Sequence, residues 1–294
     1  MGYHGFRDSL FCTISSLKKT VGGGRFFSQS VESPTLSEIY EDIKIDVPSI
    51  DKTGSYPVKV KGDDIARPVV HVLSWKGDGY PAVIWHHISG EYPVDATCRK
   101  VLLNPKHPVN ANIILVQAAY HETPAAFGMC ARDLQLFARM VAISARVIDA
   151  VVDDLSKKGI SSVVAGVKLG GWVANFHHAV SNSAYAYIPV LAGAGFGDIF
   201  VDSSFKGSVS SLARRNHQKV RRVLNFDDLF MARGSHKNVF PVLAIYDRIS
   251  NFYRQRTCYG DHKIIEFRKG HITGAKAHGK IRMVISSVTD KIKR

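Results

Sequence analysis

Three side chains with complementary chemistry are spread through this 294-residue sequence: an amine, a carboxylate and an imidazole. Lys168 stands inside the stretch Gly166-Val167-Lys168-Leu169-Gly170-Gly171. Asp247 comes two residues after an apolar run, and His271 follows Lys269-Gly270 near the end of the chain. A lysine amine can attack a carbonyl carbon or hold an anion, and an imidazole oriented by a carboxylate can move protons. These three residues are therefore the first candidates for a functional site.

The stretch around Lys168 predicts how that lysine is presented. An apolar run over 163–166 leads into the glycine-flanked turn, and helix-forming residues follow it. This order is typical of a strand, a sharp turn and a helix, with Gly166 and Gly170 at points where backbone segments pass closely. We expect Lys168 at the crest of that turn.

The rest of the chain supplies the elements of an α/β domain. Apolar runs without alternation suit strands covered on both faces, as in a parallel sheet. They occupy 81–85, 112–116, 162–166, 186–191 and 239–245, and a final strand is expected at 262–267. Apolar residues spaced by three or four predict helices over 134–155 and 281–292. Strand-like spacing at 39–45, 56–60 and 69–73 predicts a hairpin region that opens the fold.

This order of elements resembles the α/β-hydrolase family over residues 38–290. The resemblance implies a mostly parallel central sheet with helices on both faces and a short lid insertion. In that family a nucleophile, an acid and a histidine follow one another along the chain, and here Lys168, Asp247 and His271 match those positions.

A second part of the resemblance concerns the groups that stabilise a developing oxyanion. The segment His86-His87-Ile88-Ser89-Gly90 directly follows the strand that ends at Trp85, where the family carries an oxyanion loop. It departs from the usual His-Gly pair. The resemblance implies that the backbone around His87 and Ile88, together with Leu169 after the turn, supplies the donors.

A lysine at the nucleophile position changes the chemistry. Its attack on an ester would leave an amide on the protein, and amides hydrolyse far more slowly than esters, so the cycle would stall. We therefore favour a catalytically altered relative with a binding or scaffold role. Two alternatives stay open: a lysine-dependent enzyme acting on a carbonyl substrate, and a hydrolase using Ser89 or water activated by His271. An engineered replacement of serine would also explain the residue.

The charge of Lys168 separates some of these alternatives. The N-terminus of a helix and partial burial both lower the pKa of an amine, whereas Asp247 beside His271 would raise it. A neutral amine suits Schiff-base chemistry or proton transfer. A fixed cation would bind a carboxylate or phosphate, or would pair with Asp247 and close the site.

Composition limits the function classes. There are 39 Lys and Arg residues against 25 Asp and Glu, which gives a net charge of +14 and favours anionic partners of several kinds. The four cysteines lie far apart and indicate neither a disulfide framework nor a zinc site. No run has the length of a membrane span, and no motif indicates a flavin, nicotinamide or metal cofactor, so none is expected.

Two segments lie outside the predicted core. Residues 1–36 are basic and rich in Ser and Gly, which is typical of a mobile N-terminal arm or a mitochondrial transit peptide, and residues 37–294 form the predicted domain. We expect an intracellular protein, mitochondrial if this segment is a transit peptide and cytoplasmic otherwise.

The second segment outside the predicted core is a lid insertion at about 198–237. It carries basic residues followed by apolar ones, a pattern that suits an anionic membrane surface or a cover over a small or lipid-like ligand. A solvated helix face is the alternative, and the lack of interleaved aromatic residues argues against nucleic acid. The basic residues concerned are Arg214, Arg215, Lys219, Arg221 and Arg222.

Overall fold

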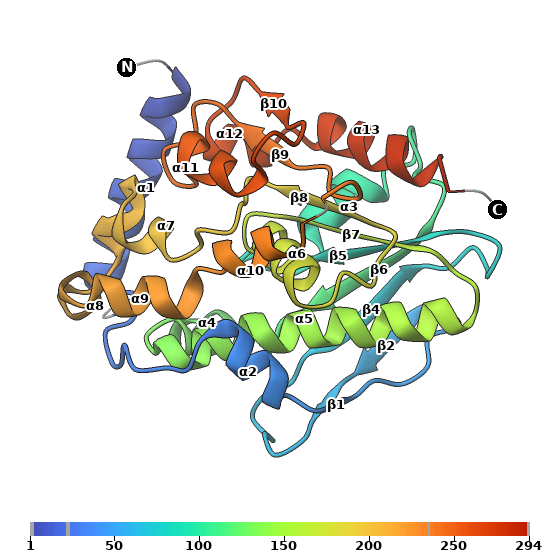
Figure 1. Cartoon of the computed structure of the whole chain (residues 1–294), viewed down its shortest axis with the longest axis horizontal. Coiled ribbons are helices and arrows are strands. Elements are labelled where there is room, and N and C mark those ends of the chain that lie inside the picture. Colours follow the sequence, from blue (N-terminus) through green and yellow to red (C-terminus); the bar gives the residue numbers. More distant parts are fainter. Residues whose placement is uncertain (1–2, 22–23, 235, 293–294) are drawn as a thin grey trace.

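An eight-stranded sheet with helices on both faces forms the body of the protein (Figure 1). The computed structural model describes residues 3–21, 24–234 and 236–292. The sheet has the strand order β10-β9-β8-β7-β5-β6-β4-β2. Its members are β2 (Gly54–Pro57), β4 (Val69–Ser74), β5 (Ala82–His86), β6 (Asn112–Gln117), β7 (Ser162–Val167), β8 (Ala186–Val190), β9 (Val242–Ala244) and β10 (Ile265–Phe267). The short strands β1 (Ile45–Asp46) and β3 (Lys59–Val60) pair separately.

Strand directions follow the predicted pattern. The pairs of β2 with β4 and of β4 with β6 are antiparallel, and the other neighbours in the large sheet are parallel. The five predicted apolar runs overlap the strands β5 to β9, because strands buried on both faces read as continuous apolar runs. Alternate residues of one strand enter different cores: Val83 and Trp85 pack on one side of the sheet, and Ile84 packs on the other.

Helices cover both faces. On one face lie α2 (Leu36–Asp42), α5 (Leu134–Lys157) and α6 (Leu169–Val180), which pack against one another. On the other face α3 (Ala96–Leu102) contacts α13 (His278–Thr289). The remaining helices are α1 (Tyr3–Val21), α4 (Pro124–Cys130), α7 (Asp198–Val201), η1 (Ser204–Ser208), α8 (Ser211–Arg215), α9 (His217–Leu224), α10 (Asp227–Ala232), α11 (Phe252–Arg256), η2 (Thr257–Tyr259) and α12 (His271–Ala275). Among the described segments, no helix combines the length and the apolar character needed to cross a bilayer.

The predicted strand at 39–45 is wrong, because most of that segment is helix α2. The Thr35 side chain accepts from the N–H of Glu38, and the Glu38 carboxylate accepts from the N–H of Thr35, which is a complete capping box. The buried residues Leu36, Ile39 and Tyr40 have helical spacing and face α5. The Thr-x-x-Glu signal was present in the sequence and outweighs the strand-like residues after it.

The N-terminal segment packs onto the domain. Helix α1 contacts η1 and α12 at one end of the molecule (Figure 1). Phe27 is fully buried, and Phe26 and Val31 are nearly so, in the same core as α5. Residues 26–36 thus lie within the packed structure, while the targeting role suggested for residues 1–36 stays a prediction.

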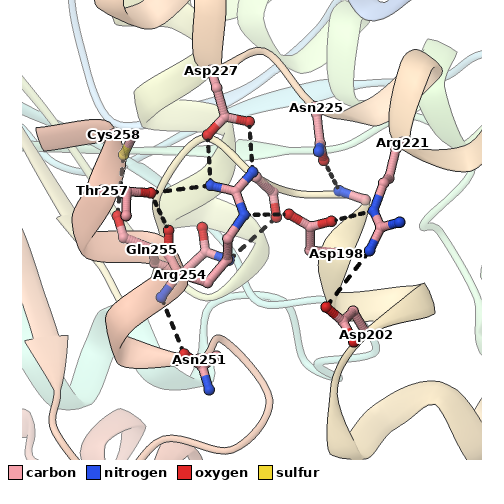
Figure 2. Close-up of polar contacts among 12 residues, drawn as sticks. Asp198, Asp202, Arg221, Asn225, Asp227, Asn251, Arg254, Gln255, Thr257 and Cys258 are labelled. Atoms are coloured by element: carbon pink, nitrogen blue, oxygen red, sulfur yellow. Dashed lines mark hydrogen bonds and ion pairs between the residues drawn. The ribbon is translucent and has the colours of Figure 1, made fainter. Parts of the chain in front are cut away.

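Helices α7 to α10 form the insertion between β8 and β9, and a charged network ties α7, α9 and α10 to α11 (Figure 2). The Arg254 guanidinium binds both carboxylate oxygens of Asp227, at 2.9 and 3.0 Å, and its Nε donates to Asp198 at 2.6 Å. Arg221 donates to the other oxygen of Asp198 at 2.7 Å. Lys219 pairs with Glu32. Two of the five basic residues proposed to face a membrane therefore have carboxylate partners within the chain, and that contact stays a prediction.

The turn between β7 and α6 yields a stability prediction. A Cβ on Gly170 would overlap the backbone carbonyl oxygen of His86, and neither backbone can move without disturbing the sheet. We expect Gly170→Ala to lower the free energy of unfolding by about 3 kcal/mol, as overpacking of a close contact does. Urea denaturation measures it. The matched control is Gly128→Ala in α4, where the added methyl meets no atom within 4 Å and stability should rise slightly. Equal effects of the two variants would contradict the close contact.

Candidate functional site

Lys168 lies at the crest of the turn between β7 and α6. Its backbone has φ 56° and ψ −116°, a conformation that non-glycine residues rarely adopt. The Lys168 N–H donates to the carbonyl of Val190 at 2.9 Å, which anchors the turn to the neighbouring strand. A side chain on Gly166 would overlap the backbone of Gly170, so both glycines are needed for the turn to close. Strain of this kind persists where the surrounding structure over-determines it, and it occurs often at functional sites.

Asp247 and His271 form a buried pair beyond the ends of β9 and β10. Nδ1 of His271 lies 2.8 Å from Oδ2 of Asp247. Oδ1 of Asp247 accepts the backbone N–H groups of Ile249 and Ser250, both at 2.8 Å. One carboxylate oxygen thus fixes the acid in its loop and the other orients the imidazole, which leaves Nε2 as the ring nitrogen available for proton transfer.

The structure places Lys168 and His271 on the wall of one cavity of about 230 Å³. Ser89, Lys168 and His271 are its polar lining side chains. The rest of the lining is apolar and mostly aromatic: Phe11, Phe26, Ile88, Phe127, Phe137, Leu169, Trp172, Phe196, Ile199, Phe200, Phe205 and Ile249. A concave apolar space with a few convergent polar groups is typical of a small-molecule site.

The Lys168 ammonium has no ion pair within 4 Å in the part of the chain that the structure describes. Instead, Nζ of Lys168 lies over the aromatic ring of Phe11, 5.7 Å from the ring centroid. Burial lowers the pKa of Lys168, and the more distant carboxylates of Asp247, Asp8 and Glu91 partly oppose this. As expected from the sequence, burial lowers the pKa of Lys168 and Asp247 raises it; burial has the larger effect.

The backbone groups predicted as oxyanion donors differ in whether they are free to donate. The N–H of Ile88 donates to Oε2 of Glu91 at 3.3 Å, and Oε1 of Glu91 accepts the N–H of Thr97 at 2.7 Å. The His87 ring accepts from the N–H of Ala118 at 3.0 Å. Leu169 begins α6, where the first-turn N–H groups have no intrahelical acceptors. The N–H of Leu169 is therefore free of an intrahelical acceptor and can donate to a ligand, whereas the N–H of Ile88 already donates to Glu91.

Ser89, the alternative nucleophile, lines the cavity but is not activated in this arrangement. It is exposed, and within the described ranges it makes no hydrogen bond to His271. A serine hydroxyl needs such a base within hydrogen-bond reach to attack efficiently.

Asp8, which the sequence did not single out, connects helix α1 to this site. It is fully buried. Its Oδ2 accepts the N–H of His271 at 2.8 Å and that of Arg248 at 3.4 Å, and Oδ1 accepts the N–H of Ile272 at 3.1 Å. One carboxylate therefore caps α12 and ties together the loops that carry His271 and Asp247.

Helix α1 also supplies Phe11 to the cavity wall, so this N-terminal helix is part of the site in the structure. Asp8 and His271 are separated by 263 residues, and no local pattern could reveal their contact. The one available signal was an acidic residue in an otherwise basic segment.

A cluster of buried imidazoles lies beside the site. His86 and His87 stack with ring centroids 4.8 Å apart, and His87 and His121 lie 4.2 Å apart. Nε2 of His121 accepts the N–H of Gly90 at 2.8 Å. Burial lowers the pKa of His86 to about 3 and that of His121 to about 4, and it places the pKa of His87 well below its usual value. These rings are neutral in the folded protein at neutral pH.

Comparison with known proteins identifies the fold. No protein-family model and no curated protein matches the sequence. Solved structures do match. The acetyl xylan esterase from Paenibacillus sp. R4 has a TM-score of 0.57 at 14% identity, covering 89% of this chain and 97% of that one. Acetyl xylan esterase 1 from Thermoanaerobacterium sp. JW/SL YS485 has a TM-score of 0.51 at 12% identity, with coverage of 86% and 96%.

A third match is the Pyrococcus horikoshii acylaminoacyl peptidase, with a TM-score of 0.55 at 12% identity, covering 87% of this chain and 44% of the peptidase. These likenesses agree with the strand order and the strand-turn-helix at Lys168. The protein therefore has the α/β-hydrolase fold. At such identities the likeness establishes the fold and not an activity.

The role of Asp8 can be tested by substitution. Asp8→Ala leaves buried N–H groups without an acceptor, so we expect the free energy of unfolding to fall by about 3 kcal/mol, and Asp8→Asn to cost less because its amide oxygen can still accept. Amide hydrogen exchange of His271 and Ile272 should accelerate. The exposed Asp64→Ala is the control, with a change within about 0.5 kcal/mol. Unchanged protection of both amides in Asp8→Ala would rule out the capping role.

The buried imidazoles predict a pH dependence of stability. The pKa of His121 is about 4 when folded and near 6.5 when unfolded, so the unfolded chain binds more protons between these values. Stability should therefore fall as the pH drops from 6.5 towards 4, and this contribution should be constant above 7. His121→Gln should reduce the slope by up to about 1.4 kcal/mol per pH unit. Urea denaturation at each pH measures the slope, with the exposed His107→Gln as control. An unaltered slope in His121→Gln would contradict the assignment.

Proposed function

We propose that this protein is an α/β-hydrolase-fold protein in which Lys168 replaces the nucleophilic serine, and that it binds a small apolar ligand rather than acting as a serine esterase. The observation that carries the proposal is the placement of Lys168 on the strained crest, lining one cavity with His271. The acid and the histidine of the site are kept, while the attacking hydroxyl is absent from its position.

The chemistry of the amine argues against turnover of esters. Acyl transfer to Lys168 would give an amide, and the acid-histidine pair that activates water against an ester intermediate would face a much less reactive bond. The Ile88 N–H that could stabilise a developing oxyanion is bound to Glu91. Two steps of the serine hydrolase cycle are therefore impaired together.

The cavity supports a binding role. Its aromatic walls come from α1, α4, α5, α6, the segment at Phe26 and the insertion. Burial of an apolar ligand against such walls contributes about 25 cal/mol per Å² of apolar surface removed from water. A small acyl chain or an aromatic group fits this lining better than a sugar or a nucleotide, which need many hydrogen-bond partners.

An active hydrolase is the second candidate, because the structural relatives named above are esterases and a peptidase. In this candidate, water activated by His271 attacks the substrate. The buried pair of His271 and Asp247 at 2.8 Å favours it, since the proton-transfer part of the site is intact.

Restoring the hydroxyl tests the proposal. We expect Lys168→Ser to gain labelling by a fluorophosphonate probe and hydrolysis of short p-nitrophenyl esters, because the base and acid are already in place. The unaltered protein and Lys168→Ala should show no multiple turnover, and the double variant Lys168→Ser, His271→Ala should lose the gain. Sustained ester cleavage by the unaltered protein that His271→Ala abolishes would replace this proposal by the hydrolase.

A further inference from the structure

The amine of Lys168 is the reactive group of the cavity that the proposed binding role leaves unexplained. It lies in apolar surroundings, and no carboxylate within 4 Å neutralises it among the described residues. We propose that Lys168 captures apolar aldehydes or ketones as a reversible imine. This inference rests on the proposed function, because it takes the cavity as the ligand site and names the class of ligand.

The surrounding charges favour a carbonyl ligand over an anion. The carboxylates of Asp8, Asp247 and Glu91 all act on Lys168, although each is held by backbone N–H groups and none lines the cavity. Their combined negative potential would oppose the carboxylate of a ligand entering beside the amine. An uncharged carbonyl compound meets no such repulsion, and imine formation removes a charge that is costly in apolar surroundings.

The lowered pKa of Lys168 also favours reaction with a carbonyl compound. Burial shifts the amine towards the neutral form, and the neutral form is the nucleophile in imine formation. The crest position points to the same chemistry, since the fold presents this residue at the end of a cavity for attack on a carbonyl carbon.

The reaction balances with the groups present. The nitrogen lone pair forms a C–N bond to the carbonyl carbon, and the oxygen takes up the proton that the nitrogen loses, which gives a carbinolamine. The C–O bond then breaks, the hydroxyl leaves as water with a proton from the His271 imidazolium, and the nitrogen lone pair closes the C=N bond. The resulting iminium returns its proton to His271, which gives the neutral imine. His271, oriented by Asp247 through Nδ1, can carry these protons on Nε2. Addition of water reverses the sequence and releases the ligand.

The lining defines the ligand class. Aromatic and aliphatic side chains dominate the cavity of about 230 Å³, and Ser89 is the polar lining group besides Lys168 and His271. A short alkyl or aryl chain on the carbonyl suits this space. A carbonyl compound that carries its own charge, such as glyoxylate, does not.

Reductive trapping tests the inference. The full-length protein is incubated with octanal and cyanoborohydride, and alkylation of each lysine is followed by peptide mass spectrometry. We expect Lys168 to be modified at least about tenfold faster than exposed Lys52, a factor that corresponds to about 1.4 kcal/mol. Glyoxylate should show no such preference. His271→Asn should slow trapping at Lys168 and leave Lys52 unaffected.

Controls separate this inference from the proposed function. Lys168→Arg should abolish the selective modification, and the matched Lys52→Arg should leave it intact. Octanol, which cannot form an imine, should still change the fluorescence of Trp172 in the unaltered protein and in Lys52→Arg because that ring lines the cavity; its signal is assigned by comparison with Trp172→Phe. A change in Trp172 fluorescence with octanol, without selective trapping by octanal, would overturn the imine and keep the binding role. Loss of both would overturn the two proposals together.

Discussion

The close approach of α6 to strand β5 is the contact on which the site depends. Gly170 meets the carbonyl of His86 with no room for a side chain, and Gly166 meets Gly170 in the same way. Closing this turn forces residue 168 into a positive φ and raises it above the sheet. Any side chain at that position is presented to the cavity, whatever its chemistry. A hydroxyl and an amine at this position would react differently on the same scaffold.

The carboxylates around the crest act on the Lys168 amine only from a distance. Three carboxylates act on Lys168 from a distance, while each is bound by backbone N–H groups. None forms a close ion pair with the amine in the described chain, so the side chain is left facing the cavity. This differs from a site closed by a salt bridge, in which the amine would be held in one position and lost to ligand chemistry.

Much of the architecture could be predicted from local pattern. Strands β5 to β9 have continuous apolar runs, and α5 has a clear helical period, because burial on both faces or on one stripe leaves a direct mark on the sequence. The turn at Lys168 was readable because its glycines have a steric role. Helix α2 was missed although Thr35 and Glu38 form a capping box, since β-branched and aromatic residues resemble a strand. The hydrogen bond from the Ile88 N–H to Glu91 had no corresponding pattern in the sequence.

The sequence by itself determined most of the order of strands and helices and the sharp turn at Lys168, because these depend on short-range periodicity and on glycine sterics. Asp247 and His271 were proposed from a family resemblance in chain order. Tertiary structure alone decided which distant groups meet at the site. Asp8 caps α12, and the Phe11 ring lies near the amine, only because α1 packs against η1 and α12. The partial burial of Lys168 is also a property of this packing, since the cavity that it lines is built from six or more segments that are remote in the chain. Contacts between such segments carry no periodic signal, and for this reason the chemistry of the amine follows from the folded chain.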